Sequence, residues 1–419
     1  MGEYKTKISP HFMNKTPGKN VNLSFYDDIY RMVGEFSSDI EWIEKVNIVL
    51  RENIDFFEEN RDFIESFCFL VYKIVFESPI TSRLVSSLCV FFGLIDVSEV
   101  NFGDFLLNLI DRASIWDIQD LLYILCNRSN ECKRFFIEDK KYIAILNELN
   151  RRKSPKLLSL LVFCSMKLQD EREVEFFIGD IVTLDYVNEW KKYFLWIVFY
   201  ITKYHAEYSQ PILYWVFNDW CFDNAELMFQ ISINVLSYLK LDTIRSFFTE
   251  SNIRILIDIF VNARGESHYG MVFFHKLTLY KRINDEIPDI LFPDVFYTNL
   301  NKRLENGNFK CKESSLMLIQ ELIPIADIHI MELFSPSLIN SLCHYLDKSD
   351  SSSIKTCMRC IIQIFRKYNR LLSKYYDVDS HQDLYGRINE IIDSFPSDET
   401  SELAIELLQI MTLNKIITS

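Results

Sequence analysis

Residues 122–127 read Leu-Tyr-Ile-Leu-Cys-Asn, and a hydrophobic phrase of this kind returns at regular intervals along the chain. Equivalent positions, taken at the polar end of each phrase or its counterpart, are Phe92, Asn127, Ser165, Tyr200, Ser237, Lys276, Gln320 and Gln363. The steps between them are 35, 38, 35, 37, 39, 44 and 43 residues, a period typical of stacked helical repeats. One repeat cannot cover its own apolar face and must pack on its neighbours. The sequence therefore predicts an all-α solenoid.

The composition is that of a globular protein with no membrane segment. Hydrophobic residues make up 49% of the 419 residues and charged residues 25%, which supplies both a core and a polar exterior. The longest apolar run, residues 193–201, is much shorter than the roughly 20 residues of a transmembrane helix. Residues 1–24 lack the apolar segment of a signal peptide. We expect a cytoplasmic or nuclear protein without a membrane partner.

The ten cysteines are expected to be reduced, and most lie within apolar helical stretches, where a free cysteine packs as a small hydrophobe. Cys357 and Cys360 have the spacing of a metal or redox pair. No second pair or nearby histidine accompanies them, whereas closed zinc sites take four ligands. Core packing is the favoured interpretation of this pair, with metal or redox chemistry as the alternative. We expect no metal and no cofactor.

The formal net charge of −14 argues against nucleic-acid binding, which depends on clustered lysines and arginines. An acidic surface attracts a basic partner and raises its association rate. A second interpretation is that the acidic excess only keeps a chain with 34 phenylalanines soluble. Charge alone does not separate the two.

The chain is predicted to consist of a tail and one array. Residues 1–24 contain four lysines and few apolar residues and are predicted to be a flexible tail. Residues 25–419 show helical periodicity interrupted by short polar turns, enough for about nine or ten repeats. In one repeat we predict a short helix near 131–137, a second over 142–150 and a third over 155–168. The third is apolar on nearly all sides and must be covered. Only a concave stripe of it should stay exposed, and that stripe is the candidate binding surface.

The recurring phrases resemble the third helices of armadillo repeats, and most of all those of importin-α, the adaptor for nuclear localisation signals. In that family the third helix carries a Trp-x-x-x-Asn pair, and a central version ends in Tyr. Tyr123 with Asn127 is similar to the first form, and Trp196 with Tyr200 to the second. The resemblance covers residues 25–412. It implies a right-handed α-solenoid of armadillo or HEAT-like repeats that binds extended basic segments in a concave groove for nuclear import.

The resemblance also implies a set of peptide-binding residues. Family tryptophans sandwich the stems of lysine and arginine, and the asparagine amides hold the peptide backbone. The candidates are Tyr123, Asn127, Trp196, Tyr200, Ser165, Ser237, Gln320 and Gln363. One departure is Arg359, at a tryptophan position, which would repel a basic peptide. For Tyr123 and Asn127 the alternative is packing inside the array, with Asn127 as a capping or turn residue.

Catalysis has no recognisable motif in this chain. There is no glycine-rich phosphate loop and no Gly-x-Ser-x-Gly elbow, and the seven histidines are scattered. We expect a non-enzymatic adaptor whose partner is a basic peptide or cargo protein. The resemblance would add importin-β, yet residues 1–24 contain no arginine, unlike the Arg-rich segment that binds it in the family. The alternative is a scaffold or regulatory subunit of a multiprotein complex without import activity.

Overall fold

The computed structural model describes residues 29–413, and the predicted tail over 1–24 lies outside them. Within this range it leaves out Tyr30, Ser38, Asn60, 97–101, Lys153, 185–189, 214–215, 217–223, 263–267, 285–291, 347–350, 369–377 and 396–397. Every regular element in the described ranges is a helix, so the predicted all-α class is confirmed. The chain divides into two compact units, residues 1–197 and 198–419.

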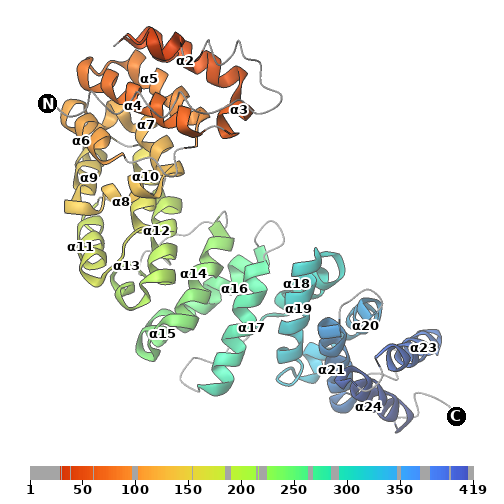
Figure 1. The fold of residues 1–419 in the computed structure, drawn as a ribbon. Coiled ribbons are helices and arrows are strands. Elements are labelled where there is room, and N and C mark those ends of the chain that lie inside the picture. The colour runs from red at the N-terminus through yellow and green to blue at the C-terminus, as the bar shows by residue number, and fades with distance from the viewer. Residues whose placement is uncertain are drawn as a thin grey trace. The chain divides into compact units, whose positions relative to one another are not determined.

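Unit 1 is a stack of helices in which successive inner helices lie side by side. Helices α2, α5, α7 and α10 pack in this order, each on the next (Figure 1). The helices of the unit are α2 (Ile40–Glu52), α3 (Ile54–Glu59), α4 (Arg61–Glu77), α5 (Ser82–Leu94), α6 (Gly103–Arg112), α7 (Ile115–Arg128), α8 (Asn130–Phe135), η3 (Glu138–Lys140), α9 (Tyr142–Arg151), α10 (Pro155–Ser165), α11 (Glu171–Ile181) and the first part of α12 (Lys191–Tyr204).

One repeat of unit 1 has the predicted three-helix pattern, in α8, α9 and α10. Helix α10 begins at Pro155, behind the N-cap Ser154, because proline suits the first helical position and a serine hydroxyl accepts a free backbone N–H. Its buried residues cover more than half of the helix circumference, and they are Leu157, Leu158, Leu160, Leu161, Val162, Cys164 and Ser165. The prediction that the third helix is enclosed on most sides is confirmed.

Unit 2 continues the same pattern. Helices α14, α17, α19, α21 and α24 pack in succession, α18 packs on α19, and α20 packs on α21. The helices of the unit are the rest of α12, η5 (Ala206–Tyr208), α13 (Gln210–Leu213), α14 (Ala225–Tyr238), α15 (Leu241–Phe247), α16 (Glu250–Asn262), α17 (His268–Ile283), α18 (Asp294–Asn306), α19 (Phe309–Leu322), α20 (Ile328–Leu346), α21 (Ser351–Lys367), α23 (Val378–Ser394) and α24 (Glu399–Leu413) (Figure 1).

Side-chain hydrogen bonds between helices reproduce the period read from the sequence. In unit 1, Tyr142 donates to Asp180, 38 residues further on, at 2.8 Å. In unit 2, Arg303 donates to the Phe260 carbonyl, 43 residues back, at 2.8 Å. Lys276 Nζ lies 3.1 Å from Ser237 Oγ, and these two were predicted to be equivalent positions. The separations of 38, 43 and 39 residues fall in the predicted range, which confirms the repeat.

The described cysteines are free thiols, and most are buried. Cys357 and Cys360 lie inside α21, where the Cys357 thiol is 3.0 Å from the Leu342 carbonyl oxygen. Burial raises the pKa of both thiols, so they stay protonated and pack as apolar groups. In the part of the chain that the structure describes, no group of three His, Cys, Asp or Glu side chains could hold a metal ion. Nor does any described helix combine the length and the hydropathy of a bilayer span.

An ion pair between repeats of unit 1 predicts a dependence of stability on pH. The Arg134 guanidinium on α8 binds the Glu173 carboxylate on α11 through two contacts, one of them 2.6 Å long, and the carboxylate is 19% exposed. The hydrogen bonds from Arg134 hold the pKa of Glu173 below its ordinary value of 4.5. The folded protein therefore binds fewer protons, so this stabilisation is present above about pH 4.5 and is lost as the pH falls below it.

Glu173→Gln should lower the free energy of unfolding at neutral pH by about 1.5–3 kcal/mol, a typical contribution of hydrogen bonds to charged groups. The loss should shrink as the pH falls from about 6 to about 3. Urea titrations over this range measure it. The matched control is Glu250→Gln, whose partner Arg254 lies on the same helix with both side chains well exposed. Equal effects of the two variants at every pH would contradict the assignment.

Candidate functional site

A hollow of about 490 Å³ lies across three successive inner helices of unit 1. Its walls combine two carboxylates, one ammonium, two hydroxyls, one thiol and one phenol ring. The lining residues are Ser82, Val85, Ser86 and Cys89 of α5, Asp117, Asp120, Tyr123 and Ile124 of α7, and Lys156 of α10. Tyr123, one of the predicted site residues, therefore lines this hollow.

Helix α7 presents its polar residues on one face. Asp117, Asp120, Tyr123 and Asn127 follow one another at three- and four-residue steps, which places them in one row along a helix. The residues between them, such as Leu121 and Leu125, are fully buried. This amphipathic pattern fixes the rotation of α7 and turns the polar row outward.

The start of α7 is well fixed. The Ser114 hydroxyl accepts the Asp117 backbone N–H at 3.2 Å and donates to the Asp117 carboxylate at 2.8 Å. A negative charge in the first turn is also favoured by the helix dipole. The side chain of Asp117 is thus held in place in the lining of the hollow.

The two carboxylates differ in their cation partners. Lys156 pairs with Asp120, and the side chains are 50% and 53% exposed respectively. In the described part of the chain, no cation pairs with Asp117. The three charged groups leave the lining with an excess of one negative charge. A cation entering the hollow would therefore meet favourable potential.

Tyr123 and Asn127 complete the polar row with an aromatic ring and an amide. The Tyr123 ring is half-buried and lies 5.7 Å from the ring of Phe163 on the next inner helix. Asn127 is exposed, and its amide has no hydrogen-bond partner among the described residues. The C-cap of α7 is Ser129, so Asn127 is not the capping residue of this helix. Its amide is available to a ligand.

The thiol and the two hydroxyls of the described lining are not activated as nucleophiles. Burial raises the pKa of the Cys89 thiol to about 11, so the thiol is protonated at neutral pH and is a poor nucleophile. The two serines of α5 that line the hollow are exposed, and no lining residue is a histidine that could act as their base. The excess negative charge of the described lining suits a cationic group.

One predicted contact residue is misplaced. Ser165 at the end of α10 is only 1% exposed, and its hydroxyl donates to the Val162 carbonyl at 2.7 Å. It faces the core and cannot contact a peptide. The reason is the rotation of α10: Lys156 and Ser159, three positions apart, lie on its less buried side, and Ser165 lies roughly opposite Lys156 on the helix.

The other predicted residues are spread over both units. Trp196 is half-buried and belongs to unit 1, whereas Tyr200 belongs to unit 2, where its ring stacks on Tyr204 with centroids 6.4 Å apart. Ser237 is exposed and accepts from Lys276. Gln320 on α19 and Gln363 on α21 are half-buried. Of the predicted residues, Tyr123 and Asn127 share one face of α7, and Tyr123 is the one that lines the hollow.

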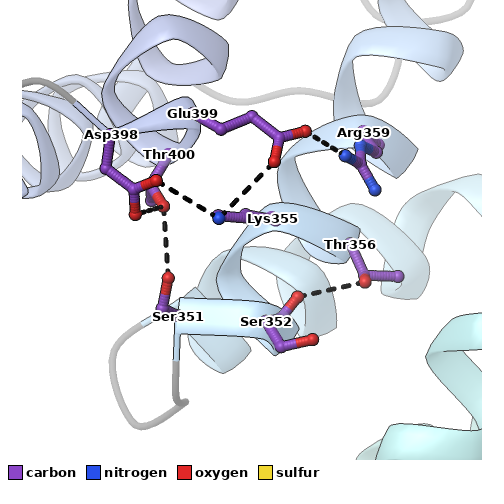
Figure 2. A network of polar contacts seen from close by, with 8 residues as sticks. All are labelled: Ser351, Ser352, Lys355, Thr356, Arg359, Asp398, Glu399 and Thr400. Carbon is purple, nitrogen blue, oxygen red and sulfur yellow. Dashed lines mark hydrogen bonds and ion pairs between the residues drawn. The ribbon is translucent and has the colours of Figure 1, made fainter.

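Arg359 does not stand as an isolated positive charge. Figure 2 shows that Glu399, at the start of α24, binds both Arg359 and Lys355 of α21, the latter at 3.5 Å. Asp398 accepts a hydrogen bond from Thr400 at 3.0 Å and another from Lys355 at 3.3 Å. Both bonds lower the pKa of Asp398, and the bond from Thr400 has the larger effect. The basic face of α21 is thus neutralised by the next inner helix.

Comparison with known proteins bears on the fold of this chain and not on its function. No family model matches the chain. No curated protein matches it either. A similar solved structure is the crystal structure of an engineered protein from the Northeast Structural Genomics Consortium, with a TM-score of 0.54 and 10% sequence identity. The match covers 92% of this chain and 99% of that one. At this identity the similarity supports the all-α architecture alone.

Sequence reasoning missed the charged residues of the hollow. Asp117 and Asp120 could have been found by extending the row of Tyr123 and Asn127 towards the start of the helix at three-residue steps. Lys156 and the small residues of α5 could not, because they reach the site only through the packing of neighbouring helices.

Proposed function

We propose that this protein is a non-enzymatic adaptor that binds an extended basic segment in the hollow of unit 1. The observation that carries the proposal is the polar row of α7, in which two carboxylates, an aromatic ring and an unpartnered amide share one face. The resemblance to importin-α supports a segment of nuclear-localisation-signal type and a role in nuclear import. Cargo recognition is the step assigned to the hollow.

Each group of the row has a matching group in such a ligand. A lysine or arginine head binds the carboxylates, and its charge is attracted to the face of the Tyr123 ring. The Asn127 amide both donates and accepts, so it can bond to an extended peptide backbone. Three neighbouring helices with axes about 8–10 Å apart span roughly 16–20 Å. Five or six extended residues have about this length.

The proposal is tested by titrating the protein with a lysine-rich peptide at low and at high salt. Binding should saturate and should weaken with salt, because exposed charges are screened. Asn127→Ala should weaken it about five-fold, the effect of losing about 1 kcal/mol of hydrogen bonding. The matched control is Asn262→Ala, which removes an exposed asparagine at the end of α16 in unit 2. A peptide that fails to saturate the protein even at low salt would refute the proposal.

A second candidate function is a scaffold or regulatory subunit without import activity. The observation that favours it comes from unit 2, where basic side chains of the inner helices contact polar or acidic side chains of neighbouring helices. Arg282 pairs with Glu321 at 2.8 Å, and Lys276 lies 3.1 Å from Ser237. Arg359 and Lys355 are also paired, with Glu399. The carboxylates that bind these cations are therefore not available to a basic peptide. The same titration separates the two functions, since a scaffold of this kind would not bind the peptide.

A further inference from the structure

Lys156 lies where a basic ligand would bind. Among the described residues that line the hollow it is the only cation, and its ammonium contacts Asp120. A lysine or arginine of a bound segment would need this same carboxylate. The pair is about half exposed, and exposed pairs contribute only about 0–1 kcal/mol. An incoming cation can therefore displace Lys156.

The position of Lys156 in α10 is unfavourable for the helix. It follows Pro155, the first residue of α10, so its charge lies in the first turn. The helix dipole favours anions there and disfavours cations. A lysine at this position does not stabilise the helix itself. Its contact with Asp120 on the neighbouring helix gives a reason for its presence. The flexible four-carbon stem also lets the ammonium move away while the backbone stays in place.

We infer that Lys156 sets the affinity of the hollow by competing with the ligand for Asp120. Binding of a basic segment exchanges one ammonium for another beside this carboxylate, and Lys156 turns towards solvent. Asp117, which has no such competitor among the described residues, is the first contact of the incoming cation. This inference rests on the proposed function and adds a residue that tunes it.

The test compares Lys156→Gln with the unchanged protein, using the same lysine-rich peptide at low salt. The variant should bind roughly two- to five-fold more tightly, because the ligand no longer competes with an ion pair of this strength. In an Asp120→Asn background, the same change should bring little gain, since the contested carboxylate is gone. Arg254→Gln on α16 is the matched control, because it removes one exposed positive charge outside the hollow.

The outcomes separate this inference from the proposed function. Tighter binding that disappears in the Asp120→Asn background supports competition. Unchanged or weaker binding by Lys156→Gln, with a peptide that still binds the unchanged protein, overturns the inference and leaves the proposed function standing. A gain that is equally large in the Asp120→Asn background shows general repulsion and also overturns it. If neither protein binds the peptide, both ideas fail.

Discussion

Phe274→Ala should lower the free energy of unfolding by about 3–5 kcal/mol, the usual loss for a buried phenylalanine. The side chain is fully buried on α17 and lies at the centre of an aromatic cluster. Its ring centroid is 5.3 Å from that of Phe260 and 5.1 Å from that of Phe296. Removing the ring leaves a cavity that these neighbours, on α16 and α18, cannot fill without moving. Urea denaturation followed by circular dichroism measures the loss.

The control for this prediction is Phe309→Ala, on the next inner helix, α19. Its side chain is 56% exposed, so its removal should change the free energy of unfolding by no more than about 0.5 kcal/mol. Similar losses for the two variants would contradict the described core of unit 2. The size of the difference reports how well the aromatic cluster is packed.

The second large effect is expected in binding. A double variant with Asp117→Asn and Asp120→Asn should weaken the lysine-rich peptide roughly 30-fold, which corresponds to about 2 kcal/mol of lost charged hydrogen bonds. Asparagine keeps the shape of each side chain, and both positions are exposed, so the fold should be unchanged. Isothermal titration calorimetry at low salt gives the affinities. At high salt the difference should shrink because the charges are screened.

A change of net charge alone must be excluded. Glu250→Gln with Asp258→Asn makes the same change of charge on α16, in the other unit and on exposed positions. This control should keep the affinity of the unchanged protein within about two-fold, because neither residue lines the hollow and exposed charges are screened by salt. If it weakens binding as much as the first double variant does, the peptide responds to overall charge and the hollow is not its site.

The repeat period could be predicted because packing requires it. Each repeat must bury its apolar face on the next, so equivalent residues recur at similar spacing, and a hydrogen bond joins Ser237 and Lys276, two of the positions predicted to be equivalent. The three helices of one repeat, α8 to α10, were also predicted. Their starts and ends follow local signals such as Ser154 and Pro155.

The site could be predicted only where a helix has two different faces. Helix α7 has a polar row and a buried row, so the exposure of Asn127 followed from its position. Helix α10 has only Lys156 and Ser159 to mark its open side, and Ser165, which lies roughly opposite Lys156, was placed wrongly. The contact of Lys156 with Asp120 joins residues 36 apart and depends on the stagger of two neighbouring helices. No pattern within a single repeat contains that information.

The side-chain hydrogen bonds between neighbouring repeats have a consequence for how the chain acquires its fold. Those of Tyr142, Lys276 and Arg303 each reach about one repeat along the sequence, so neighbours in space are near neighbours in the chain. Little entropy is lost in closing such short loops, and chains with local contacts fold fast. We expect folding to keep pace with synthesis on the ribosome, with each finished repeat offering a ready surface to the one that emerges next.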